Sequence, residues 1–144
     1  MVNNMIPKPY TLIDHTADLA IEVIGSSFTE LMENAGFALF DIICNPEEIA
    51  QKKEFQIQLK QESPNELLRT WLEALLEQFN INSTVYSKFS VNDENKNMFT
   101  CHAWGETIDL SKHTYHTEIK AITYHQFEVK QNKDGWIAKI IFDV

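Results

Sequence analysis

The segment that most constrains the fold is a predicted amphipathic helix that begins after Ser63. Ser63 suits the N-cap, Pro64 suits the first helical position, and Glu66 completes a capping box. The residues that follow place an apolar side chain every three or four positions, which predicts a wide face packed into a core. The members of this stripe are Leu67, Leu68, Trp71, Leu72, Leu75, Leu76 and Phe79.

A second helix is predicted upstream, directly after a short strand. Residues 19–24 alternate as a strand, and Gly25-Ser26-Ser27 ends it. Ser27 with Glu30 forms another capping box, and apolar residues then recur with a period near that of a helix. Asn45-Pro46 ends this helix because proline cannot continue it.

Most of the remaining chain is predicted to form strands. Residues 92–97 form a polar turn between two of them, and Asp134-Gly135 is a strong hairpin signal between the last two. The predicted strands cover residues 54–60, 85–91, 98–103, 117–129 and 136–142.

Two helices among about seven strands, without regular alternation, indicate the α+β class. We expect a largely antiparallel β-sheet packed with two α-helices, forming a single compact domain over residues 1–144. Residues 1–8 are expected to be a flexible N-terminal segment.

The last hairpin predicts what lies beside the end of the chain. If Val129 opposes Trp136, then Asp143 falls opposite Ile122, with an uncertainty of one or two residues in register. The C-terminal aspartate should therefore lie beside the segment of residues 120–125.

Composition narrows the classes of function. Asp and Glu number 21 against 12 Lys and Arg, for a net charge of −9, so the surface repels nucleic-acid phosphates. Partners with basic patches, or cations, fit better. The two cysteines, Cys44 and Cys101, lie too far apart in sequence for a Cys-x-x-Cys motif, which argues against a disulfide framework and a cysteine zinc site. No apolar segment approaches the roughly 20 residues of a membrane span, so we expect a cytoplasmic protein.

Two short segments carry candidate ligands for a cation. Asp14-His15-Thr16-Ala17-Asp18 combines carboxylates, an imidazole and a hydroxyl, although the residues alone favour a turn in which Asp14 or Thr16 bonds nearby backbone. At the other end, Asp143 precedes the carboxylate of Val144, and clusters of such oxygens suit Ca²⁺ or Mg²⁺. From the residues alone, an ordinary charged chain end is the favoured explanation of the second segment.

Catalytic patterns are weak. His113 and His116 form an H-x-x-H spacing that lacks the helical i, i+4 arrangement of zinc proteases. These residues, with His102 and His125, are interpreted as scattered surface or sheet histidines. The sequence contains neither a nucleophile elbow nor a phosphate-cradling glycine loop.

Several of these stretches, in their order and spacing, resemble the archease family from about residue 9 to the end of the chain. The specific combination is HTAD, which ends at Asp18, with KAITYH, which spans residues 120–125. Gly105-Glu106 after a strand, the helix after Ser27 and the chain end Phe142-Asp143-Val144 also match.

The resemblance implies a protein that is not an enzyme but activates an RNA ligase of the RtcB type. It implies promotion of the ligase's GTP-dependent guanylylation and multiple turnover in tRNA splicing or RNA repair, without stable direct binding of nucleic acid. It further implies a divalent cation, calcium with magnesium as the alternative, held by Asp18, Asp143 and Val144. Asp14, His15 and Lys120 are candidates for the residues around these ligands. A metal-dependent hydrolase and a general protein chaperone are the alternative functions.

Overall fold

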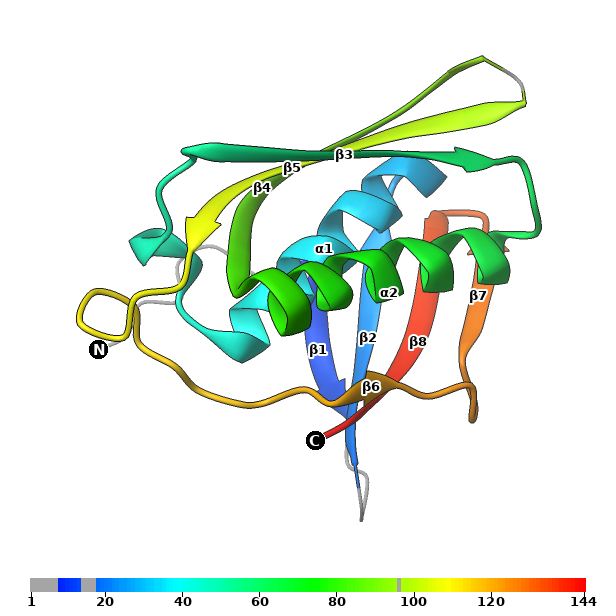
Figure 1. Ribbon diagram of the computed structural model, residues 1–144. Helices are drawn as coiled ribbons and strands as arrows, with labels where there is room; N and C mark the ends of the chain where they lie inside the picture. The colour runs from blue at the N-terminus through cyan, green and yellow to red at the C-terminus, as the bar shows by residue number, and fades with distance from the viewer. Residues whose placement is uncertain (1–7, 14–17, 96) are drawn as a thin grey trace.

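The computed structural model describes residues 8–13, 18–95 and 97–144. Its strands form two antiparallel sheets with two long helices packed against them (Figure 1). The five-stranded sheet has the order β1-β2-β8-β6, and β7 also pairs with β8. Its strands are β1 (Tyr10–Ile13), β2 (Leu19–Gly25), β6 (Ala121–Ile122), β7 (Glu128–Asn132) and β8 (Gly135–Asp143).

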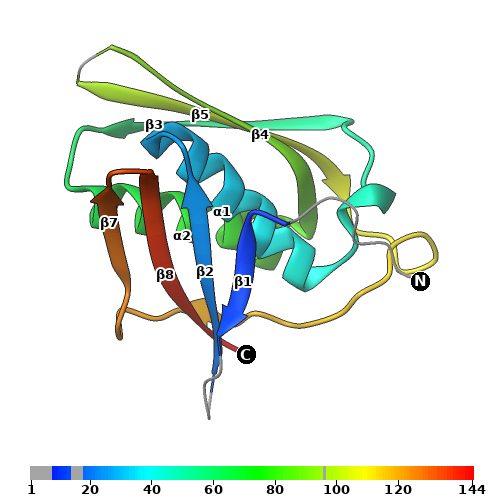
Figure 2. The ribbon, with the colours of Figure 1, turned by 180° about the vertical axis from the view of Figure 1, so that it is seen from behind.

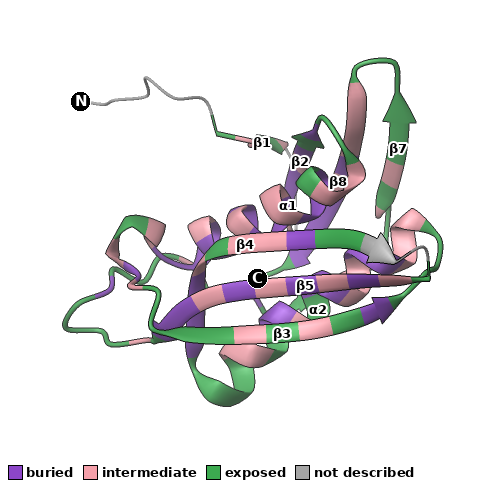
Figure 3. Cartoon of the chain, turned by 90° about the horizontal axis from the view of Figure 1, so that it is seen from above, coloured by how far each residue is buried: buried purple, intermediate pink, exposed green. Residues whose placement is uncertain are grey.

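The second sheet has three strands in the order β3-β5-β4, and Figure 3 shows it from above. Along its central strand, buried and less buried residues alternate, as expected when one face of a sheet covers a core. The strands of this sheet are β3 (Lys53–Lys60), β4 (Thr84–Asn95) and β5 (Met98–Thr107).

The helices α1 (Phe28–Ile43) and α2 (Pro64–Asn82) begin where the capping boxes predict. The Ser27 hydroxyl accepts a hydrogen bond from Glu30 N at 3.1 Å, and the Ser63 hydroxyl accepts one from Glu66 N at 3.3 Å. The helix α1 contacts β2 and β8 of one sheet and β4 of the other, while α2 packs beside α1. A short 3-10 helix, η1 (Pro46–Glu48), follows α1.

The stripe of apolar residues on α2 lies in the core, as the sequence predicts. Trp71 is fully buried and donates a hydrogen bond from Nε1 to Met32 O of α1 at 3.0 Å, which satisfies its polar atom. Its ring meets Phe89 of β4 edge to face, and Phe89 in turn stacks on Phe40 of α1. These aromatic contacts join both helices to the three-stranded sheet.

The α+β prediction is confirmed, with the difference that the strands divide into two sheets. The strand predicted over residues 117–129 is wrong: only β6 and the start of β7 fall within it. Between them the chain turns, with Gln126 at a φ of 57° and a hydrogen bond from Phe127 N to Tyr124 O. The strand β1 is an addition, and β4 continues to Asn95, so the predicted turn over residues 92–97 is shorter than expected.

The predicted register of the last hairpin is wrong by two residues, because Val129 pairs with Ala138. The hairpin is tighter than expected, and Gly135 adopts a φ of 139° at its tight turn, which favours glycine. The turn over residues 123–127 shifts the pairing back, so Asp143 pairs with Ala121, one residue from the expected Ile122. The two deviations nearly cancel.

Both cysteines are buried free thiols, in agreement with the absence of a predicted disulfide. Burial raises the pKa of the Cys101 thiol to about 12. Among the residues that the structure describes, no helix combines the length and the apolar character needed to cross a bilayer. Residues 1–7, which make up most of the predicted flexible segment, lie outside the described ranges.

Gly105 of β5 lies very close to the backbone of β4. A Cβ atom at this position would lie 1.8 Å from Val85 O and 2.7 Å from Tyr86 Cα, both in the backbone of β4. We expect Gly105→Ala to lower the free energy of unfolding by more than about 3 kcal/mol, because the clashing backbone of β4 pairs with β5 and packs on α1, and cannot move aside without losing these contacts. Urea unfolding followed by circular dichroism measures this.

The matched control is Gln58→Ala on the exposed face of edge strand β3, which should change the free energy of unfolding by less than about 0.5 kcal/mol. Equal stabilities of the two variants would contradict the close approach at Gly105.

Candidate functional site

Asp18 and Asp143 meet at one edge of the five-stranded sheet. The antiparallel register of β2 and β8 pairs Leu19 with Phe142, and one further step places Asp18 opposite Asp143. On its other side Asp143 pairs with Ala121, and Lys120 N donates a hydrogen bond to Asp143 O at 2.7 Å. Residues from the two ends and from the segment before β6 thus converge on one edge.

The two aspartates lie on the face of the sheet that points away from the helices. Figure 2 turns this face towards the viewer. Ile21 and Phe142 belong to the core on the helix side, and successive side chains of a strand alternate between faces. Asp143 is therefore exposed at the outer face, and Asp18 is half-buried.

The pairing of two acids contrasts with the rest of this face. Glu22 of β2 opposes Lys139 of β8, which balances charge, whereas the same register continued by one residue sets Asp18 opposite another carboxylate. Within the described ranges, neither aspartate side chain has a hydrogen-bond or ion-pair partner. The Lys120 ammonium in particular does not pair with either of them. Directly opposed like charges destabilise a sheet, so this edge is suited to a cation that neutralises them.

The donor atoms fit a hard divalent cation in type but supply only part of its shell. Carboxylate oxygens are the ligands that Ca²⁺ and Mg²⁺ prefer, and calcium takes about six to eight of them. Asp18, Asp143 and the carboxylate of Val144 can provide some of these, with water or a partner for the remainder. No group of three or more His, Cys, Asp or Glu side chains with metal-binding geometry occurs in the described part of the chain. The predicted candidates Asp14 and His15 lie outside it.

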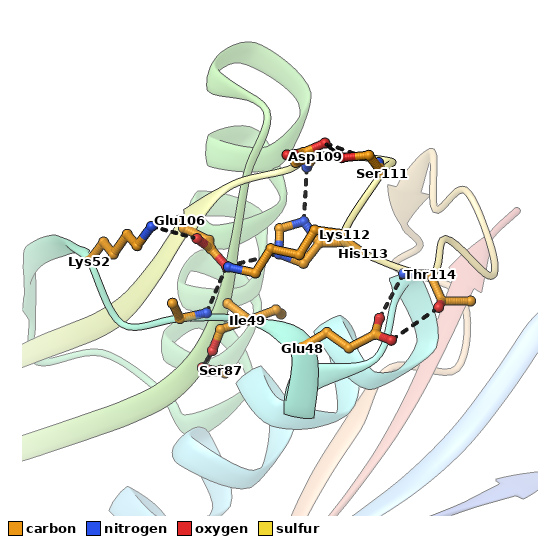
Figure 4. Close-up of polar contacts among 11 residues, drawn as sticks. Glu48, Ile49, Lys52, Ser87, Glu106, Asp109, Ser111, Lys112, His113 and Thr114 are labelled. Atoms are coloured by element: carbon orange, nitrogen blue, oxygen red, sulfur yellow. Dashed lines mark hydrogen bonds and ion pairs between the residues drawn. The ribbon is translucent and has the colours of Figure 1, made fainter.

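A second polar centre, absent from the sequence predictions, lies around Glu106 at the end of β5 (Figure 4). Glu106 is 6% exposed and His113 is 3% exposed. Asp109 N donates to His113 Nδ1 at 2.8 Å, so the remaining ring nitrogen, Nε2, carries the proton that it donates to Glu106 at 2.9 Å. Burial and this fixed tautomer distinguish His113 from the surface histidine that the sequence suggested.

The Glu106 carboxylate is held in its charged form. Ala50 N donates to Glu106 Oε2 at 2.7 Å, and Lys112 Nζ donates to the same oxygen at 2.6 Å. These hydrogen bonds lower the pKa of Glu106 to about 2, and the bond from His113 acts in the same direction. A carboxylate with three donors and little solvent access is an anchor for the chain and not a proton carrier.

The anchor fixes the segment of residues 108–120, which connects the two sheets. Beyond His113, Thr114 donates a backbone hydrogen bond to Glu48, and His116 N donates one to Ile43 O. The segment ends at Lys120, beside Asp143. The sequence signal for this centre was limited to Glu106, which follows the strand predicted over residues 98–103, with Lys112 and His113 shortly downstream.

The other histidines are not part of a metal site in the described chain. His116 is exposed and contributes its backbone to the contact with Ile43, so the H-x-x-H spacing joins no ligand pair. His102 stacks on Trp104 with ring centroids 5.5 Å apart, and its Nδ1 lies 2.6 Å from Glu54. The interpretation of His102 as a sheet histidine is confirmed.

Loss of the Glu106 charge should destabilise the fold. We expect Glu106→Gln to lower the free energy of unfolding at pH 7 by about 3 kcal/mol, because it leaves buried donors without an anionic acceptor. Glu54→Gln removes a partly exposed carboxylate and should cost less than about 1 kcal/mol. Chemical denaturation of both variants gives the comparison, and equal losses would contradict the anchoring role.

The effect of Glu106 should also depend on pH in a defined direction. Its folded pKa lies below the ordinary value of 4.5, so its stabilisation is full above about pH 5 and is lost as pH falls towards about 2. We expect the difference in unfolding free energy between the unsubstituted protein and Glu106→Gln to stay constant from pH 7 to 5 and then shrink. A difference that widens on acidification would contradict this assignment.

Comparison with known proteins gives a consistent result over nearly the whole chain. The family model described as "Archease protein family (MTH1598/TM1083)" matches residues 10–144. The curated Protein archease of Methanosarcina barkeri is 36% identical over 141 residues, which cover 95% of this chain and 97% of that protein. The Protein archease of Pyrococcus furiosus is 36% identical over 135 residues, covering 91% and 95%.

Solved structures agree with the fold. The solution structure of protein 1598 from Methanobacterium thermoautotrophicum is 26% identical, with a TM-score of 0.77 over 95% of this chain and 99% of that one. A crystal structure from Thermotoga maritima, described as an archease and possible chaperone, is 22% identical. Its TM-score is 0.68, over 99% of this chain and 100% of that one, and at this identity it supports the fold alone. With its family model matched from β1 to the final residue, the chain belongs to the archease family.

Proposed function

We propose that this protein is a non-catalytic accessory protein that activates an RNA ligase of the RtcB type. In this role it promotes the GTP-dependent guanylylation of the ligase and its multiple turnover during tRNA splicing or RNA repair in the cytoplasm. Membership of the archease family supports the proposal. The observation that carries it is the pair of opposed carboxylates, Asp18 and Asp143, at an exposed sheet edge.

The carboxylate edge, by which we mean Asp18 directly before β2 and Asp143 at the end of β8, is proposed to hold a divalent cation, calcium or alternatively magnesium. Asp18, Asp143 and the carboxylate of Val144 are its proposed ligands, and Asp14, His15 and Lys120 are proposed to surround them. The cation would neutralise the opposed carboxylates and fix the shape of this edge. Lys120 would contribute a positive charge on the strand side, where its backbone already binds Asp143.

The charge of the protein favours a particular kind of contact. A net charge of −9 steers the chain towards a basic surface, and the active site of an enzyme that joins RNA ends must bind phosphates. The acidic edge would face this active site and reorganise it, while the RNA remains bound to the ligase.

Removal of either carboxylate tests the proposal. We expect Asp18→Ala and Asp143→Ala each to reduce stimulation of guanylylation of the cognate ligase at least tenfold, because each would remove a ligand of the cation. Incorporation of labelled GTP into the ligase is the measurement, with circular dichroism to verify folding.

Asp134→Ala is the matched control, since Asp134 is an exposed aspartate at the opposite end of the same sheet. Full stimulation by both site variants would overturn the proposed role. Phosphatase or nuclease activity that chelator and Asp18→Ala both abolish would favour the hydrolase alternative instead.

The contribution of the chain end makes a separate prediction. A tag fused after Val144 removes the free carboxylate next to Asp143, so it should weaken calcium binding more than a tag at the N-terminus. Isothermal titration calorimetry of the two tagged proteins measures the difference. Equal affinities would mean that the terminal carboxylate is not a ligand.

A further inference from the structure

A groove lies between the C-terminal half of α2 and strand β6. Figure 1 shows both elements on the side that faces the viewer. Its volume is about 420 Å³. Leu76, Glu77 and Ile81 line it from the helix, and Ala121 and Ile122 line it from the strand. It contains none of the buried polar contacts around Glu106.

One exposed apolar side chain, Ile81, lines this groove, and two others, Tyr124 and Val144, follow shortly after residues at or next to its strand wall. Ile81 at the end of α2 is 70% exposed, and Tyr124 in the turn after β6 is 67% exposed. Val144, after β8, is 41% exposed. Tyr124 is held in place because the Arg69 guanidinium of α2 lies over its ring, 4.0 Å from the centroid. Large apolar side chains gathered beside a groove mark a surface for protein contact.

The helix wall of the groove is acidic and incompletely paired. Glu73 lies 4.0 Å from Arg69 Nε, but Arg69 is also paired with Glu66. Glu77 has no hydrogen bond or ion pair within the described residues. The Glu77 carboxylate thus remains available to a cationic side chain from outside, next to the apolar contact that Ile81 offers, while Lys120 lines the opposite wall.

The groove and the carboxylate edge share strand β6 but lie on opposite faces of the sheet. Ala121 lines the groove and also pairs with Asp143. A partner seated in the groove would have to pass the outer edge of β6 to reach Asp18 and Asp143.

We propose that this groove is the docking surface for the ligase, and that it binds a ligase segment carrying an apolar side chain next to a lysine or arginine. The inference rests on the proposed function and adds the location and chemistry of the contact. The apolar side chain would pack on Leu76 and Ile81, and the cation would pair with Glu77.

Charge complementarity selects this occupant over two others. A nucleic-acid backbone would place phosphates against Glu73 and Glu77, which repel them. In a symmetric dimer the groove would meet the same groove, which carries two glutamates and one lysine, so an excess of negative charge in one copy would face the same excess in the other. A basic segment of a different protein meets neither obstacle.

The test measures affinity of the full-length chain for the purified cognate ligase by biolayer interferometry. We expect Ile81→Asp and Glu77→Lys each to weaken binding by about tenfold or more, as hot-spot residues do. Both side chains are exposed, so the melting temperature and calcium affinity should be unchanged. Raising the salt concentration should weaken ligase binding by the unsubstituted protein more than ligase binding by Glu77→Lys.

The matched controls are Ile24→Asp on β2 and Glu47→Lys on η1. These replace an exposed isoleucine and an exposed glutamate away from the groove, and they should leave the affinity unchanged. Normal binding by both groove variants, while the unsubstituted protein binds and stimulates the ligase, would overturn the docking surface alone. If the unsubstituted protein neither binds nor stimulates the ligase, the proposed function is overturned, and the docking surface with it.

Discussion

The pairing of β2 with β8 is the interaction on which the rest of the structure depends. It joins a strand near the beginning of the sequence to the final strand over the register from Leu19 with Phe142 to Gly25 with Trp136. Ile21 and Ile140 are fully buried on the helix side, so a register shift of one residue would expose this apolar face. The same register places Asp18 opposite Asp143. The forces that bury the core therefore also bring two carboxylates together.

The other sheet contributes by fixing the connection that returns to this edge. The close approach at Gly105 aligns β5 with β4, and Glu106 follows at the end of that strand. Glu106 and His113 then anchor residues 108–120, which cross from the three-stranded sheet to Asp143. A buried ionic anchor is costly to break, because the loss of one partner leaves the others uncompensated. Here it selects one path for the segment that ends at Lys120.

The two sides of the proposed working surface have complementary properties. The carboxylate edge concentrates negative charge without a cationic partner in the described chain, which suits an ion or a basic surface. The groove on the other face of β6 offers an exposed apolar contact from Ile81 of α2. An accessory protein needs both a stable attachment and a group that acts on its partner. Strand β6 lies between the two surfaces and belongs to both.

The sequence by itself determined the two helices, their capped starts, most strands and the α+β class, because these depend on local periodicity and capping residues. It also brought Asp143 to within one residue of its observed partner. It did not determine the path of residues 108–127, because that segment follows side-chain anchors far apart in sequence, such as Glu48 with Thr114. The buried state of His113 was likewise decided by tertiary structure, since only the folded chain places Glu106 and the Asp109 amide on opposite sides of its ring. Local patterns encode elements, whereas the juxtaposition of Asp18 with Asp143 exists only once β2 and β8 pair.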